Sequence, residues 1–323
     1  MLRRLLPFAV AALAAAPVAF ADGGSVPPGL QGGAGAPGPG GGVRYVAVDS
    51  GSNTVVQEIK DGSVVRWTTI PGKWGIPSVA YDGSIGGVSR DGWTLVLAPT
   101  QVGYPLRKRS SFELLSTATF RSMGRVSLKG DFSFDALSPD GSKLYLIQHV
   151  SKRDLNRYVV RAYDLDLNRL LPGRIADRTQ RGWVMAGWPL TRATSADGRW
   201  VYTLYARPDG YPFVHALDTV RGVAHCVGIP WHGSQNGVWR LRMSLRDGGR
   251  TLSLHSPNGH EYLAIARGTW RISHPGSVHV AASRSGDFPW WTVGLGAALG
   301  AALLLGAVRL KGRYGLRART ATN

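Results

Sequence analysis

The sequence is poor in cysteine and in acidic residues. Cys226 is the only cysteine, which excludes an internal disulfide and a metal site built on several thiolates. Only 20 aspartates and glutamates stand against 38 lysines and arginines, so the formal net charge is +18. Without disulfides the fold must depend on an apolar core, and about 240 residues between the two chain ends are enough for one domain.

Familiar catalytic motifs are also missing. The sequence has no Gly-x-Ser-x-Gly nucleophile elbow and no Gly-x-x-x-x-Gly-Lys phosphate-binding loop. His225 and Cys226 are adjacent, so on a strand they would face opposite sides and could not share a metal ion. His232 and His274 have no evident third ligand. We therefore predict no metal and no cofactor. An enzyme is not excluded, because separated loops can assemble an active site.

The N-terminus has the composition of a secretory signal peptide over residues 1–21. Arg3 and Arg4 precede an apolar run, and Ala19-Phe20-Ala21 matches a small-x-small cleavage site. The alternative, an amphipathic first helix, would need a polar face that this run lacks. Residues 22–42 are rich in glycine and contain four prolines, so we predict a flexible linker there.

Charge is absent from Phe288 to Val308, a run of 21 residues. A helix needs roughly 20 residues to cross the hydrocarbon layer, so 288–308 is predicted to be a transmembrane helix, with a buried core helix as the alternative. The tail, 309–323, holds five cations and no acid, which predicts a cytoplasmic location. Gly296 and Gly300 form a Gly-x-x-x-Gly pair, the spacing of a helix-mediated homodimer.

These ends predict a single-pass protein of the cell membrane whose N-terminal part lies outside the cell. Residues 22–289 hold 31 basic and 20 acidic residues, because seven cations lie in the two terminal segments. A basic exterior favours an anionic wall polymer, an acidic glycan, lipid head groups or a protein partner. The compartment disfavours nucleic acid.

Between the ends, one short corner recurs about every 50 residues, the spacing of a propeller blade. In each copy a serine is followed by an aspartate that can bond its own backbone and a glycine suited to positive φ, which predicts a tight hairpin turn. The copies are Ser89-Arg90-Asp91-Gly92, Ser138-Pro139-Asp140-Gly141, Ser195-Ala196-Asp197-Gly198 and, with one extra residue, Ser244-Leu245-Arg246-Asp247-Gly248. We interpret the aspartates as turn residues rather than catalytic groups.

Short β-rich runs after each corner predict five units of four strands. The first unit begins at its second strand, Tyr45–Val48. We expect its missing first strand to be Ser277–Ser283, which is followed by Arg284-Ser285-Gly286, a degraded copy of the corner. Pairing between the two ends would remove open sheet edges.

With these corners, residues 43–286 resemble the secreted bacterial β-propellers of the YVTN and TolB-like (WD40-like) kind. Ser138–Ile147 and Ser195–Tyr205 carry the resemblance best. It implies an all-β fold: a single propeller of five four-stranded blades, the C-terminal strand completing the first. The alternative is an unrelated all-β sandwich with recurring Asp-Gly turns. Such propellers are binding scaffolds, sensors and occasionally enzymes, so the resemblance selects no function.

In a four-stranded blade, the loops joining strands two to three and four to one share one face, which we call the loop face. The tight corners share the other, the corner face. Aromatic and basic residues expected on the loop face suit sugars, phosphates and flat anions. These residues are Lys73, Trp74, Arg107, Arg109, Trp188, Trp231 and His232. Tryptophans that cap the core between blades are the alternative.

First strands lie nearest the propeller axis, so four polar residues on or near them are candidates for the channel. These are Asp135, Arg192, Arg242 and His279. The alternative for each is a solvated charge at the channel mouth. Since the predicted closing strand runs almost directly into the membrane helix, we expect the corner face to lie near the bilayer and the loop face to point away.

Three hypotheses remain. The first is a membrane-anchored extracellular domain that binds or senses an anionic or glycan ligand, or a protein partner, on the loop face. The second is a lactonase-like hydrolase or lyase that acts near the axis through Asp135, His279 and a metal. The third is a structural scaffold that has no small ligand.

Overall fold

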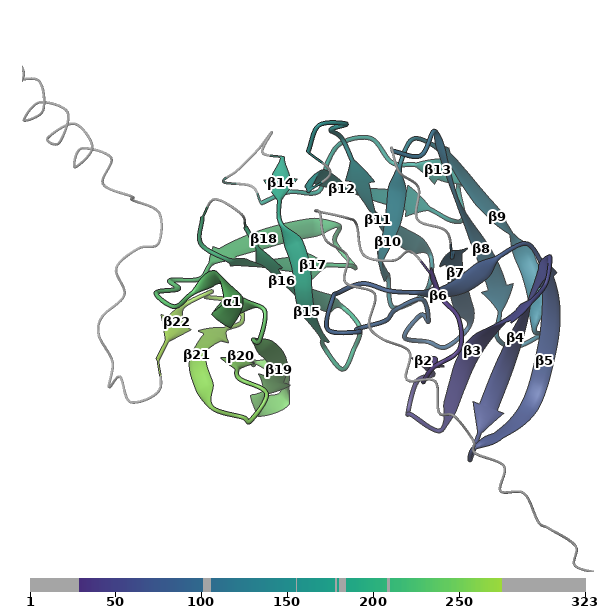
Figure 1. The fold of residues 1–323 in the computed structure, drawn as a ribbon, viewed down its shortest axis with the longest axis horizontal. Helices are drawn as coiled ribbons and strands as arrows, with labels where there is room; N and C mark the ends of the chain where they lie inside the picture. Colours follow the sequence, from purple (N-terminus) through teal and green to yellow (C-terminus); the bar gives the residue numbers. More distant parts are fainter. Residues whose placement is uncertain are drawn as a thin grey trace, which may run out of the picture. The chain divides into compact units, whose positions relative to one another are not determined.

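The structure is a computed structural model that describes residues 29–100, 106–154, 156–177, 179, 184–207 and 210–274. Strands dominate the described residues and form five antiparallel sheets, which follow one another along the chain (Figure 1). The first sheet contains β2 (Ala36–Pro37), β3 (Val43–Ser50), β4 (Asn53–Lys60) and β5 (Ser63–Pro71). The second contains β1 (Gly29–Leu30), β6 (Trp74–Pro77), β7 (Thr94–Pro99), β8 (Arg109–Ser116) and β9 (Arg121–Lys129).

The remaining three sheets have the same meander order. The third contains β10 (Phe132–Leu137), β11 (Lys143–His149), β12 (Arg157–Asp164) and β13 (Arg169–Leu170), with β14 (Met185–Ala186) also paired to β12. The fourth contains β15 (Trp188–Thr194), β16 (Trp200–Ala206), β17 (Phe213–Asp218) and β18 (Val223–Gly228). After the short helix α1 (Gln235–Val238), the fifth contains β19 (Arg242–Arg246), β20 (Thr251–His255), β21 (Glu261–Ala266) and β22 (Ile272–Ser273).

Three of the four predicted corners form from local hydrogen bonds, whereas the fourth, at Ser244, leads into a short 3-10 turn at Asp247–Gly249. At Ser138, the hydroxyl donates to Asp140 Oδ1 at 2.5 Å and accepts from the Lys143 amide at 2.8 Å. Asp140 Oδ1 in turn accepts from the Ser142 amide at 3.1 Å, and Gly141 has a φ of +70°. The corners at Ser89 and Ser195 repeat these contacts. In these three corners the aspartate carboxylates bond within their own turns.

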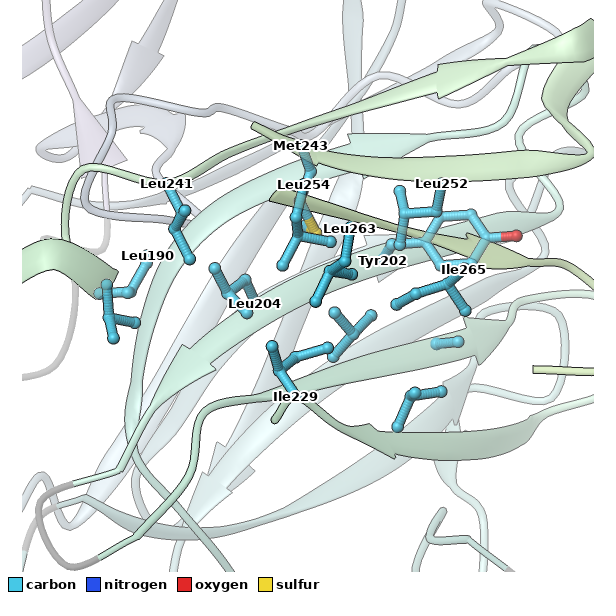
Figure 2. Packing of buried hydrophobic residues seen from close by; sticks show 14 of the residues in the cluster. Leu190, Tyr202, Leu204, Ile229, Leu241, Met243, Leu252, Leu254, Leu263 and Ile265 are labelled. Carbon is cyan, nitrogen blue, oxygen red and sulfur yellow. The ribbon is translucent and has the colours of Figure 1, made fainter. Parts of the chain in front are cut away.

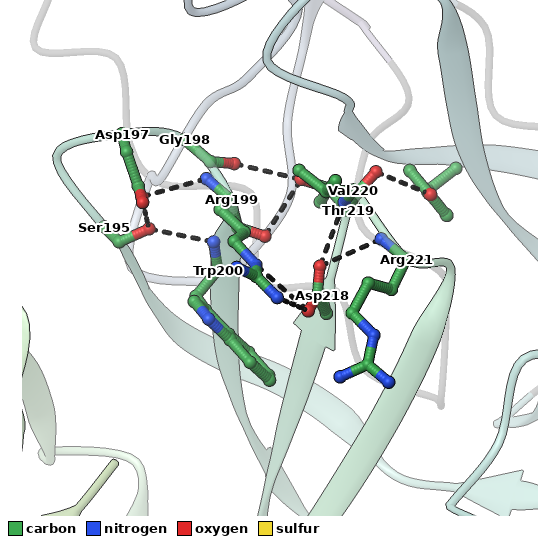
Figure 3. A network of polar contacts seen from close by, with 10 residues as sticks. Ser195, Asp197, Gly198, Arg199, Trp200, Asp218, Thr219, Val220 and Arg221 are labelled. Atoms are coloured by element: carbon green, nitrogen blue, oxygen red, sulfur yellow. Dashed lines mark hydrogen bonds and ion pairs between the residues drawn. The ribbon is translucent and has the colours of Figure 1, made fainter. Parts of the chain in front are cut away.

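Each corner also braces the turn between the third and fourth strands of its sheet. In the fourth sheet the buried Asp218 carboxylate accepts from Arg199 Nη2 at 2.7 Å and from the amides of Val220 and Arg221 (Figure 3). Thr219 Oγ1 donates to the Arg199 carbonyl at 2.9 Å. These charge-assisted bonds hold the pKa of Asp218 below its ordinary value although burial alone would raise it.

Successive sheets pack face to face through apolar side chains. The largest cluster lies between the fourth and fifth sheets and includes Leu204, Leu254 and Ile265 (Figure 2). Similar clusters join the first sheet to the second, the second to the third and the third to the fourth. Four-stranded antiparallel sheets stacked in chain order are the β-propeller architecture. The all-β prediction is therefore confirmed, while the number of blades in the complete ring stays a prediction.

The N-terminal Gly/Pro segment corrects two predictions. Residues 22–42 are not a linker throughout, because Gly29–Leu30 pairs with β6 and Ala36–Pro37 pairs with β3. Glycine permits the first pairing, since a Cβ at Gly29 would lie 2.4 Å from the Ala98 carbonyl oxygen. The first sheet thus has an N-terminal first strand. The proposed closing strand, 277–283, lies outside the described residues.

In the second sheet, the strand that begins with β6 is interrupted by residues 78–86, which we call the excursion. After β6 the chain leaves the sheet and returns where Val88 bridges Leu95. Within the excursion, the amides of Tyr81 and Asp82 donate to the carbonyls of Pro189 and Leu190 on β15, at 2.9 and 3.0 Å. The excursion therefore joins the second sheet directly to the fourth.

The predicted signal peptide, transmembrane helix and cytoplasmic tail lie outside the described residues. Among the residues that the structure does describe, no helix has the length and hydropathy needed to cross a membrane.

Candidate functional site: two cavities beside a buried ion pair

Two of the four predicted axis residues form a buried ion pair between the third and fourth sheets. Asp135 lies at a register shift in β10, a bulge that changes the direction of a side chain. Arg192 on β15 donates from its guanidinium to the Asp135 carboxylate and to the Asp135 carbonyl. Its Nε also donates to Thr203 Oγ1 at 3.1 Å. The side chains are only 8% and 3% exposed for Arg192 and Asp135, so each neutralises the other away from water.

The other two axis candidates do not join this pair. Arg242 Nη1 donates to the carbonyls of Leu241 and Trp239, at 2.9 and 3.4 Å, beside its own strand. His279 lies outside the described residues. Sequence alternation could not separate these cases, because it does not say which strand bulges.

A polar row crosses the fourth sheet from Arg192. Thr203, His215 and Cys226 occupy successive paired positions on β16, β17 and β18. His215 Nδ1 lies 3.6 Å from Cys226 Sγ. Burial lowers the pKa of His215 to about 4 and raises the pKa of Cys226 to about 12. Both groups are therefore neutral near pH 7, and the pair does not provide a thiolate nucleophile. Reasoning from the sequence missed His215, because only its pairing across the sheet places it beside the cysteine.

On the loop face, the ion pair borders a cavity of about 50 Å³. The polar lining includes Asp135, Arg192, His149 and the tyrosines Tyr158 and Tyr205. The Tyr158 hydroxyl is buried and interacts with the hydroxyl of Tyr205, and His149 Nδ1 is buried 3.7 Å from Asp131 Oδ1. Burial raises the pKa of Tyr158 well above its ordinary value, so the phenol stays a neutral donor. The cavity is large enough for water-sized polar groups, and it offers them both donors and acceptors.

Aromatic side chains border this loop-face cavity. Trp188 lines it and lies 6.1 Å from Trp239, measured between ring centroids. Tyr81, from the excursion, meets Trp239 edge to face at 5.5 Å. Trp239 is 41% exposed, so its ring is available to solvent beside the cavity. The arrangement combines an apolar rim with a small polar interior.

On the corner face, the same ion pair borders a larger cavity of about 330 Å³. Its lining comes from the segment after β2, the excursion and its return, β10, and the corner at Ser195. We call it the corner-face cavity. The larger of the two cavities thus lies on the face opposite to the predicted loop-face residues.

The remaining loop-face candidates are engaged within the protein. Trp74 lies on β6 rather than in a surface loop, is 5% exposed and packs between the first and second sheets, with its Nε1 donating to the Pro71 carbonyl. Arg107 pairs with Asp131 at 2.6 Å and also donates to the Phe132 carbonyl. Lys73 Nζ lies 3.3 Å from Asp49 Oδ1. Trp74 is thus part of the core and Arg107 is half-buried in an ion pair, whereas Lys73 makes its ion pair at the surface.

Three candidates remain at the surface but apart from the cavities. Arg109 donates to Ser127 Oγ at 3.1 Å. Trp231 is half-buried, donates to the Ser234 carbonyl at 3.0 Å and meets Tyr262 edge to face, while His232 is exposed. His274 approaches the Tyr262 carbonyl. No group of three His, Cys, Asp or Glu side chains in the described part of the chain is placed to hold a metal ion.

Comparison with known proteins does not assign the chain to a family. No family model matches the chain, and no curated protein does. Among solved structures, it is similar to hydrazine synthase of Kuenenia stuttgartiensis, with a TM-score of 0.40, 13% identity, and coverage of 72% of this chain and 76% of that chain. The chain is also similar to the β-propeller domain of Cps50 (Swd1) from Myceliophteria thermophila, with a TM-score of 0.43, 11% identity, and coverage of 81% of this chain and 71% of that chain.

A third similar structure is BamB from Moraxella catarrhalis, with a TM-score of 0.39, 17% identity, and coverage of 73% of this chain and 61% of that chain. This chain thus spans less than two thirds of that BamB chain. Similarity of this extent identifies no function. The β-propeller fold of the described residues is instead established by the sheet order and by the packing of successive sheets.

Proposed function

We propose that this chain is a membrane-anchored extracellular β-propeller of five blades that binds a glycan through its loop-face cavity. The observation that carries the proposal is a cavity bordered by Asp135 and Arg192 and lined by the buried phenols of Tyr158 and Tyr205. A ligand hydroxyl that forms a hydrogen bond with one of these phenols would gain about 0.5–1.5 kcal/mol.

The donors and acceptors favour a hydroxyl-rich ligand over an anion. The axis candidate Arg192 is neutralised by Asp135, and the loop-face candidate Arg107 by Asp131, so neither is a free cation for an anion. Sugar hydroxyls both donate and accept, which matches a lining of carboxylate, guanidinium, phenol and imidazole. Trp188 and Trp239 supply flat apolar surface for the face of a sugar ring.

The cavity admits only part of such a ligand. A volume of about 50 Å³ accepts one or a few hydroxyl-sized groups, and the rest of the ligand would lie against the rim. The proposal therefore concerns the edge of a larger glycan, and we expect monosaccharides to bind weakly. The membrane anchor is proposed on the uncharged run 288–308 and the basic tail that follows it.

Titration of the full-length chain in detergent with β-1,4-linked oligosaccharides of glucose and of N-acetylglucosamine tests this proposal. Tyr158→Phe should weaken binding about threefold to tenfold, because it removes one hydrogen bond. Tyr202→Phe is the matched control, since Tyr202 is also a buried tyrosine but does not line the cavity. Absence of saturable binding, or equal effects of the two substitutions, would refute the glycan site.

Extraction of cell membranes with alkaline carbonate tests the anchor. The full chain should stay with the membrane pellet, and a variant that ends after residue 287 should be recovered in the soluble fraction. Release of the full chain by carbonate would contradict membrane anchoring without bearing on the cavity.

A further inference from the structure

We propose that the corner-face cavity is a second binding site, which takes a carboxylate group carried on a compact apolar body. A volume of about 330 Å³ lies within the range of small-molecule pockets. This site shares only the Asp135–Arg192 partition and Phe134 with the loop-face cavity. The inference therefore does not depend on glycan binding.

The charge of the cavity comes from Arg90. Arg192 and Asp135 compensate each other at the base, whereas Arg90 is exposed and has no ion-pair or hydrogen-bond partner among the described residues. One uncompensated guanidinium therefore borders the hollow. A guanidinium presents parallel N–H groups to a carboxylate, so this geometry favours a planar anion.

The backbone of the neighbouring corner leaves room for Arg90. Its side chain lies against Gly198, where an added Cβ would come within 2.8 Å of Arg90 Cβ. Gly198 also has a φ of +72°, which glycine adopts without strain. Arg90 and Ala196 occupy the same position in their corners, and both line the cavity.

Apolar residues form much of the remaining lining, which also includes Thr194. Side chains of Pro39, Ile85, Val88, Leu137 and Val201 border the cavity. The hydroxyls of Ser89 and Ser195 are already bonded to their own corner aspartates, so they do not add free polar groups. A ligand that fits has one anionic end and a small hydrocarbon or aromatic body, rather than several hydroxyls.

Fluorine NMR of the full-length chain in detergent tests this assignment with two probes, 4-fluorophenylacetate and its uncharged isostere 4-fluorophenylacetamide. The carboxylate should bind at least about fivefold more tightly than the amide, and Arg90→Gln should remove that preference by weakening carboxylate binding about tenfold. Arg109→Gln, which changes an exposed arginine outside both cavities, should leave both affinities unchanged.

Two further variants separate this site from the other one. Ala196→Trp should fill the cavity and remove binding of both probes, whereas Tyr158→Phe should affect neither. Thermal melting establishes whether each variant is folded. If Ala196→Trp does not fold, the comparison of carboxylate and amide binding in Arg90→Gln still tests the proposal. Equal binding of acid and amide, or unchanged carboxylate binding in Arg90→Gln, would overturn the proposal.

Discussion

Asp135 and Arg192 form a buried ion pair, so their contributions to the free energy of unfolding should be strongly coupled. Arg192→Met keeps much of the side-chain volume but leaves the Asp135 carboxylate and carbonyl without their donors, at a carboxylate that is 3% exposed. Removing one partner of a buried ion pair costs about 3–5 kcal/mol. For a domain of this size that corresponds to a fall in melting temperature of about 6–20 °C.

The second partner supplies the decisive comparison. Asp135→Asn in the Arg192→Met background removes the orphaned charge, so the double variant should be more stable than Arg192→Met alone. The interaction energy from the double-mutant cycle should exceed about 1 kcal/mol. Urea unfolding followed by circular dichroism gives the four free energies of unfolding, with the m-value used to detect any change in cooperativity.

A surface arginine calibrates the measurement. Arg109→Met removes an exposed guanidinium with a single hydrogen bond, and its effect should stay within about 0.5 kcal/mol. The reasoning would be refuted if Arg192→Met unfolded like the parent chain, or if the two single effects added without interaction. Either result would mean that the two side chains are not paired in a water-poor environment.

Three other predictions concern separate features. Because burial lowers the pKa of His215 to about 4, the unfolded chain binds more protons than the folded chain between pH 6.5 and 4. The free energy of unfolding should therefore fall by about 2 kcal/mol from pH 7 to pH 5. Urea midpoints at the two pH values measure this fall, and His215→Gln should remove most of it. Gly141 has a φ of +70°, and a Cβ there would lie 2.8 Å from Thr94 Oγ1, whereas Gly83 also has a positive φ but has open space around it. Gly141→Ala should therefore reduce the free energy of unfolding by more than the roughly 1–2 kcal/mol expected for Gly83→Ala. Equal melting temperatures of the two variants would contradict this. Burial also raises the pKa of Cys226 to about 12, so Ellman's reagent should label it rapidly only after unfolding, and rapid labelling of the folded chain would show that the thiol is accessible and ionised.

The corners could be predicted from the sequence because their interactions are local. Ser138, Asp140 and Gly141 complete their hydrogen bonds within a few residues, so the turn needs little from the rest of the fold. The third strands were equally readable, since runs of β-branched and aromatic residues such as Val159–Tyr163 fall inside β12. Both signals are properties of a short stretch of chain.

The features that the sequence did not reveal depend on contacts between distant residues. Gly29–Leu30 becomes a strand only because β6 offers it an edge, and its composition by itself is typical of a linker. Trp74 looked like a loop residue but is buried by packing between two sheets. Asp135 and Arg192 were identified as candidates, yet their pairing required the bulge in β10 and the positions of two sheets.

The excursion at residues 78–86 has a consequence for the order in which the protein matures during synthesis. Its amides bond to Pro189 and Leu190, which leave the ribosome more than a hundred residues later. Non-local contacts of this kind slow folding, because a long loop must close before they form. A nascent chain that ends after the third sheet would expose an unpaired segment, and release of such a fragment should make it a substrate for proteases and chaperones.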